Sequence, residues 1–125
     1  MKKTILIVDD EADVIQILDF KLKEEGYATI TAEDGEEALK KAKKHKPDLV
    51  LLDLLMPRMD GGEVARKLRE DNKTKDIPVI ILTATLAPDD TKGIRLERGN
   101  MMFPKSTSFD ELVAKINQVL EEHKD

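Results

Sequence analysis

The sequence predicts an α/β protein with a doubly wound (βα)5 fold. This is a three-layer sandwich in which helices cover both faces of a parallel sheet with strand order 2-1-3-4-5. The prediction rests on short, nearly unbroken apolar runs that alternate along the chain with segments of helical apolar spacing. The length of 125 residues corresponds to one domain, which we expect to span residues 1–125.

Three apolar runs are predicted to be the central strands. They are residues 5–8 (ILIV), 49–52 (LVLL) and 79–82 (VIIL), each too short for a helix and rich in branched side chains. A strand that is apolar on both faces must be covered on both faces, as in the middle of a parallel sheet.

Two other segments are predicted to be edge strands. Residues 28–32 (ATITA) mix polar and apolar side chains, and residues 101–103 (MMF) stop at Pro104, which has no backbone N–H to donate. Placing these two strands outside the three apolar runs gives the order 2-1-3-4-5, with right-handed crossovers between the strands.

Helices are predicted between the strands and at the end of the chain. Gly26 and Pro47 are expected to end the first two, and Ser108 with Glu111 to cap the last. The apolar faces are Val14, Ile17, Leu18 and Leu22 in the first helix, Ala38, Leu39 and Ala42 in the second, Val64, Ala65 and Leu68 in the third, and Leu112, Val113, Ile116, Val119 and Leu120 in the last.

A further helix is expected within residues 88–98, and we predict that it is short or mobile. Gly93 interrupts its pattern, and only Ile94 and Leu96 are large apolar residues.

The composition excludes several classes of function. The chain has no cysteine, which excludes disulfide scaffolds, thiolate metal sites and cysteine nucleophiles. Its 21 Lys and Arg against 26 Asp and Glu give a net charge of −5 and no surplus basic stripe, so we expect no direct binding of nucleic acid. No apolar run approaches the about 20 residues of a membrane span, so we expect a cytoplasmic protein without a membrane partner.

Polar residues stand where four of the predicted strands end. They are Asp9 and Asp10, Asp53, Thr83, and Lys105. Taken singly, each would be an ordinary turn or strand-end residue. The carboxyl ends of parallel strands meet at one edge of the sheet, however, so the joint pattern predicts a binding site.

The residue types at this edge indicate phosphoryl chemistry. Clustered carboxylates repel one another unless they take up a proton or bind a cation, and oxygen ligands suit Mg²⁺ better than Zn²⁺. A lysine and a hydroxyl beside a metal can stabilise a phosphoryl group, and one carboxylate can act as the nucleophile.

The chain resembles the receiver domains of two-component response regulators, of the type found in chemotaxis regulators. The motifs that carry the resemblance are residues 7–11 (IVDDE), 34–39 (DGEEAL), 48–57 (DLVLLDLLMP), 59–61 (MDG), 77–84 (IPVIILTA) and Lys105. The likeness covers all 125 residues. It implies a flavodoxin-like fold and a phosphorylatable signalling switch in a phosphorelay rather than a turnover enzyme.

The resemblance also implies roles for the acidic residues. Asp53 would accept a phosphoryl group from a phosphohistidine on a sensor histidine kinase or a phosphotransfer protein. Asp10 and Asp53 would ligate Mg²⁺ together with the backbone carbonyl of Leu55, and Asp9 would act mainly through water. The metal would neutralise charge and position the reacting groups.

The other two site residues are implied to read the phosphorylated state. Lys105 would pair with the phosphoryl oxygens, and the Thr83 hydroxyl would move onto the phosphate and pull the following loop. An unidentified downstream protein would recognise that conformation, and the chain would be a monomer or a weak phosphorylation-dependent dimer.

The sequence departs from the family pattern at two positions. Met102 stands where an aromatic residue is usual, and Ser106 replaces the proline that usually follows the lysine. A cis bond without proline costs roughly 2.5–4 kcal/mol, so we predict a trans bond between Lys105 and Ser106.

Two other functions remain open at this stage. A pseudo-receiver would signal through protein contacts without phosphate, and its expected mark is a loss of acidic residues. A phosphatase of the haloacid-dehalogenase type would use an aspartyl nucleophile, but it requires a second Asp where this chain has Leu55.

Overall fold

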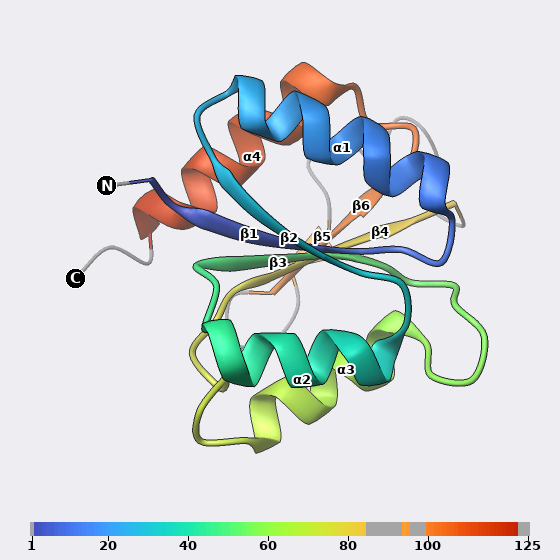
Figure 1. Cartoon of the computed structure of the whole chain (residues 1–125). Helices are drawn as coiled ribbons and strands as arrows, with labels where there is room; N and C mark the ends of the chain where they lie inside the picture. The colour runs from blue at the N-terminus through green and yellow to red at the C-terminus, as the bar shows by residue number, and fades with distance from the viewer. Residues whose placement is uncertain (1, 85–93, 96–99, 123–125) are drawn as a thin grey trace.

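A computed structural model of the chain describes residues 2–84, 94–95 and 100–122 (Figure 1). Its elements are β1 (Thr4–Val8), α1 (Ala12–Glu24), β2 (Ala28–Ala32), α2 (Gly35–His45), β3 (Leu49–Asp53), α3 (Gly61–Glu70), β4 (Val79–Thr83), β5 (Ile94–Arg95), β6 (Met101–Pro104) and α4 (Phe109–Glu122).

The sheet confirms the predicted arrangement of parallel strands. The strand order is β2-β1-β3-β4-β6-β5, and the pairs from β2 through β6 are all parallel. With β6 as the fifth parallel strand, this is the order 2-1-3-4-5. In Figure 1, α1 and α4 cover one face of the sheet, and α2 and α3 cover the other.

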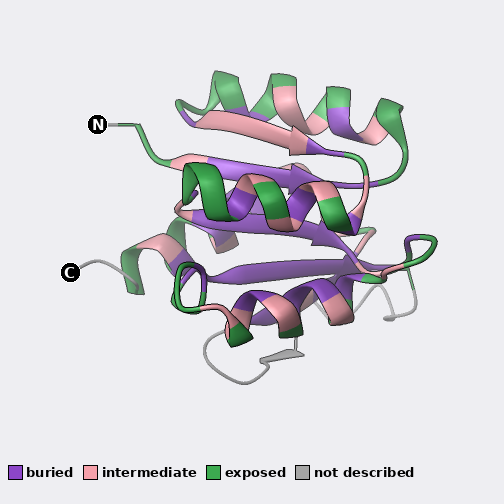
Figure 2. Ribbon diagram, turned by 60° about the horizontal axis from the view of Figure 1, so that its bottom comes forward, coloured by how far each residue is buried: buried purple, intermediate pink, exposed green. Residues whose placement is uncertain are grey.

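Burial follows the predicted division between central and edge strands for β1 to β4, but not for β6, which was expected at the edge and has three of its four residues buried. Every residue of β3 and β4 is buried, as are all residues of β1 after Thr4, whereas only the last residue of β2 is buried (Figure 2). The continuous apolar runs therefore identify strands that are covered on both faces.

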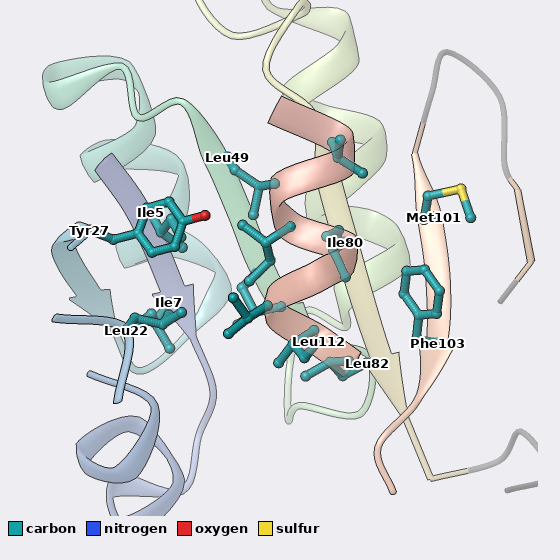
Figure 3. Close-up of a cluster of buried hydrophobic side chains, with 14 of the residues drawn as sticks. Ile5, Ile7, Leu22, Tyr27, Leu49, Ile80, Leu82, Met101, Phe103 and Leu112 are labelled. Atoms are coloured by element: carbon teal, nitrogen blue, oxygen red, sulfur yellow. The ribbon is translucent and has the colours of Figure 1, made fainter. Parts of the chain in front are cut away.

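Two hydrophobic cores lie on opposite faces of the sheet. Ile5 and Ile7 belong to the core beneath α1 and α4, which Figure 3 shows, whereas Leu6 and Val8 belong to the core beneath α2 and α3. The division arises because successive side chains of a strand point to opposite faces. Each apolar run thus anchors helices on both sides.

The predicted helix ends are confirmed. Gly26 has φ 96° just after α1. α2 ends at His45, where Lys46 takes the left-handed conformation just before Pro47. At the start of α4, the backbone N–H of Glu111 donates to the Ser108 hydroxyl at 3.2 Å.

The helix expected within residues 88–98 is not found where that segment is described. Ile94 and Arg95 form β5, which pairs antiparallel with β6, and the rest of the segment lies outside the described residues. The prediction is wrong at these two positions, and β6 is consequently not the outermost strand. Gly93 weakens a helix here, and pairing satisfies backbone groups that β6 would otherwise leave open.

Among residues 2–84, 94–95 and 100–122, none of the helices has the length and apolar character needed to cross a membrane.

Candidate functional site

The candidate site lies at the carboxyl ends of the parallel strands. In the sheet register, Asp53 at the end of β3 is level with Leu82, and Thr83 at the end of β4 is level with Pro104. The Lys105 amide donates to the Thr83 carbonyl at 2.8 Å, which continues the ladder just beyond β6. Parallel pairing therefore brings residues from distant parts of the sequence to one edge, as predicted.

Three carboxylates form the acidic part of the site. Asp9, Asp10 and Asp53 each offer one oxygen, and these oxygens lie within 4.8 Å of one another. Asp9 and Asp53 are only 3% and 5% exposed, whereas Asp10 is exposed. Hard carboxylate oxygens at this spacing fit a divalent cation such as Mg²⁺, with the exposed side available to water ligands.

Lys105 is a cation that faces two of these carboxylates and Glu11. Its Nζ lies 3.5 Å from Asp53 Oδ1, 3.7 Å from Asp9 Oδ2 and 3.6 Å from Glu11 Oε1. One ammonium faces several carboxylates, so negative charge remains at the site. Glu11 is absent from the predicted set of site residues, although it directly follows the two aspartates in the sequence.

Burial and charge shift the pKa values at the site. Desolvation raises the pKa of Asp9, and a hydrogen bond from the Glu11 amide opposes part of this rise. Desolvation also raises the pKa of Asp53, where the attraction of Lys105 opposes it. Burial alone would lower the pKa of Lys105, but the attraction of Asp9, Asp53 and Glu11 together outweighs it and raises that pKa. The carboxyl groups of Asp9 and Asp53 therefore resist ionisation while Lys105 stays charged.

Thr83 and Leu55 flank Asp53 in different ways. Thr83 is fully buried at the end of β4, next to the strand that carries Asp53. A hydrogen bond from the Leu55 amide to the Asp53 carboxylate offsets only a small part of the rise in the pKa of Asp53 that burial causes. Leu55 itself is 58% exposed.

The backbone after Asp53 is held by a close contact with α3. The Gly61 amide donates to the Leu54 carbonyl at 2.8 Å. A Cβ atom at Gly61 would lie 2.5 Å from the Asp53 carbonyl oxygen and 2.9 Å from Leu54 Cα. Only a glycine allows the start of α3 to approach the end of β3 this closely.

The bond between Lys105 and Ser106 is trans, as predicted. Met102, at the position where the family usually has an aromatic residue, is partly buried and packs against the core beneath α2 and α3.

Because the carboxyl pKa values are raised, we predict that lowering the pH increases the free energy of unfolding of the metal-free protein. Because the folded state holds the Asp53 proton more tightly than the unfolded state, stability falls as the pH rises from about 4, the ordinary carboxyl value, through the raised pKa. We expect the free energy of unfolding of the wild type, minus that of Asp53→Asn, to increase as the pH falls from neutral toward about 4.

Urea unfolding at a series of pH values, without metal, measures this difference. Saturating Mg²⁺ should flatten the pH dependence, because a bound cation favours the ionised carboxylates. A difference that stays constant with pH would contradict the raised pKa of Asp53.

Comparisons with known proteins agree with this geometry. A family model described as the response regulator receiver domain matches residues 5–117. Among solved structures, the receiver domain of the Francisella response regulator 1452 is similar, with a TM-score of 0.84 and 31% sequence identity. The match covers 98% of this chain and 100% of that one.

Two curated relatives match almost the whole chain. The alkaline phosphatase synthesis transcriptional regulatory protein PhoP of Bacillus subtilis is 41% identical over 121 residues, which are 96% of this chain and 49% of PhoP. The phosphate regulon transcriptional regulatory protein PhoB of Pseudomonas aeruginosa is 43% identical over 119 residues, which are 94% of this chain and 52% of PhoB. The chain spans about half the length of these relatives.

Proposed function

The chain belongs to the family of response regulator receiver domains of two-component systems, and on this premise we propose that Asp53 is the residue that accepts the phosphoryl group. Asp9, Asp10 and Asp53, with the backbone carbonyl of Leu55, would hold Mg²⁺. The observation that carries the proposal is the buried Asp53 carboxylate, which faces the Lys105 ammonium beside two further aspartates.

The arrangement supports transfer from a phosphohistidine. A carboxylate oxygen of Asp53 attacks phosphorus, the bond from phosphorus to the donor imidazole nitrogen breaks, and that nitrogen keeps the electron pair and takes up a proton. Lys105 offsets the negative charge on the phosphoryl oxygens. Mg²⁺, when bound, would supply charge neutralisation.

Thr83 and Lys105 are proposed to register the modification. Lys105 is shared among three carboxylates, so an added phosphoryl group would compete for it. The hydroxyl of Thr83 would turn toward the phosphate and bias the equilibrium between two conformations of the domain.

Incubation with acetyl phosphate and Mg²⁺, followed by intact-mass measurement, tests the proposal. We expect a gain of one phosphoryl group that requires the metal and is released by hydroxylamine, as expected of an acyl phosphate. No gain in mass would favour a pseudo-receiver, and steady turnover of a phosphate ester would favour a phosphatase.

Leu55 is predicted to prolong the life of the acyl phosphate. Its apolar side chain lies two residues beyond the acceptor and cannot orient a hydrolysing water molecule by hydrogen bonding. Leu55→Asn should therefore speed the loss of phosphate by about 10-fold, which is less than the roughly 10²–10⁴-fold typical of a residue that transfers a proton, because an amide only orients the water.

Loss of radiolabelled phosphate from purified phosphoprotein gives this rate. Leu55→Met is the matched control, because it keeps an apolar side chain, and should decay like the wild type. Equal decay rates in Leu55→Asn and wild type would refute the role of Leu55.

The partners and context of the chain also belong to the proposal. We propose that residues 1–125 form one receiver domain that meets a sensor histidine kinase or phosphotransfer protein in the cytoplasm, without catalysing turnover of another substrate. PhoP and PhoB are named transcriptional regulatory proteins, and the matched part is about half of each. That this chain itself binds no nucleic acid stays a prediction, as does its oligomeric state.

A further inference from the structure

The turn between β2 and α2 contacts both the segment that carries Asp9 and the loop that follows Asp53 at the end of β3. At one side, the Asp9 amide donates to the carbonyl of Ala32, the last residue of β2, at 3.2 Å. At the other side, Gly35, the first residue of α2, lies against Met59 in the loop that follows Asp53. The turn therefore touches the segment of Asp9 and the loop of residues 54–60.

The contact at Gly35 leaves no room for a side chain. A Cβ atom there would lie 2.8 Å from Met59 Sδ, 2.9 Å from Val64 Cγ2 and 3.0 Å from Met59 Cβ. The Met59 sulfur could rotate away, but Met59 Cβ is fixed to the loop backbone, and Val64 is fully buried in α3. Enlarging Gly35 therefore displaces the loop or α3.

A second contact joins the same two segments. Arg58 lies 3.9 Å from the Asp34 carboxylate, and Asp34 also caps α2 by accepting from the Glu37 amide at 2.8 Å. The ion pair is exposed and contributes little energy by itself. It nevertheless places Arg58 and Met59 together on the start of α2.

We propose that Gly35 is a positioning residue for the phosphoryl-acceptor loop, because its missing side chain lets Met59 pack on α2 and so fixes residues 54–60 beside the acidic cluster. The inference rests on the proposed function, in which Asp53 and the Leu55 carbonyl hold Mg²⁺. Gly35 touches neither group, so its effect is transmitted through the loop that carries the Leu55 carbonyl and directly follows Asp53.

The test is an NMR titration of the whole chain with Mg²⁺, in which the amide signals of Leu54 and Leu55 are followed. Gly35→Ala should weaken Mg²⁺ binding by about 10-fold, as is typical when support behind a metal ligand is disturbed. It should also shift both amide signals before metal is added. Urea unfolding of each variant reports stability separately.

Gly62→Ala is the matched control, because Gly62 also stands in the first turn of a helix. A Cβ atom there meets only Asp60 Oδ1, at 3.4 Å, so Mg²⁺ affinity should stay within about two-fold of the wild type. Gly35→Ala combined with Val64→Ala removes both γ-methyl groups of Val64, one of which stands 2.9 Å from the added Cβ atom. The double variant relieves the contact with α3 but leaves the contact with Met59, so it should keep the weakened Mg²⁺ affinity, and it also serves if Gly35→Ala alone does not fold. Full recovery of the affinity would assign the effect to α3 and overturn the role of the Met59 contact.

The outcomes separate this inference from the proposed function. Lower stability of Gly35→Ala with unchanged Mg²⁺ affinity and unshifted Leu54 and Leu55 signals would overturn the positioning role. If the wild type binds no Mg²⁺, the proposed metal site fails, and the loop signals alone decide the role of Gly35: a shift supports it, and no shift overturns it.

Discussion

Asp53→Asn is expected to abolish phosphorylation of the chain by acetyl phosphate and, without metal, to raise its stability. An amide oxygen is a poor nucleophile and cannot form the acyl phosphate, so the gain in mass should disappear completely. The stability effect has a separate cause. Burial disfavours the charge on Asp53, and a neutral isostere removes that cost at neutral pH.

The gain in the free energy of unfolding should be on the order of 1 kcal/mol, the size of an ordinary substitution. Lys105 keeps Asp9 and Glu11 as partners in the variant, so the substitution does not strand a buried cation. Mg²⁺ should reverse the ranking of the two proteins, because the variant has lost a charged ligand. Intact mass and urea unfolding, with and without Mg²⁺, measure both effects.

Asp48→Asn is the matched control at the opposite end of the same strand. The Asp48 carboxylate accepts from the Thr4 amide at 2.7 Å, far from the acidic cluster along β3. This change should lower stability by at most about 1 kcal/mol and leave phosphorylation intact. Phosphorylation that survives in Asp53→Asn would mean that another residue is the acceptor.

Gly61→Ala is expected to reduce both stability and phosphorylation. The new methyl group would lie 2.5 Å from the Asp53 carbonyl oxygen and 2.9 Å from Leu54 Cα, and neither backbone atom can rotate away. Overpacking of this kind costs about 1–3 kcal/mol. Relief by shifting α3 or the end of β3 would displace Asp53, so Mg²⁺ affinity and the rate of phosphorylation should fall together.

Gly62→Ala provides the comparison one residue later. Alanine is favoured over glycine in a helix by roughly 0.5–1 kcal/mol, and no backbone atom obstructs it at this position. We therefore expect Gly62→Ala to be neutral or stabilising in urea unfolding and normal in phosphorylation. If Gly61→Ala behaved in the same way, the close approach of α3 to β3 would not matter for the site.

Most of the candidate site could be predicted because its polar residues stand at or just beyond the ends of apolar runs. Asp9, Asp53 and Thr83 each follow a continuous apolar run, and such a run indicates a strand that is covered on both faces. The topology of a parallel sheet brings the carboxyl ends of these strands together. The roles of these residues, by contrast, came from the resemblance to a family and stay proposals until the chain is phosphorylated.

The two-residue strand β5 could not be predicted in this way. Two residues have no periodicity, and their state depends on the open edge that β6 offers. The pairing of Glu11 with Lys105 was missed because Glu11 lies beyond the end of β1, in the connection to α1, where strand register does not place a side chain.

The order of apolar runs and strand-end charges was sufficient to determine the layers, the parallel strand order and the edge of the sheet that carries the acidic residues. The need for glycine at positions 35 and 61 was decided only by the tertiary structure. Local preferences and periodicity act between neighbours along the chain, whereas the room for a Cβ atom depends on backbone and side chains from other elements.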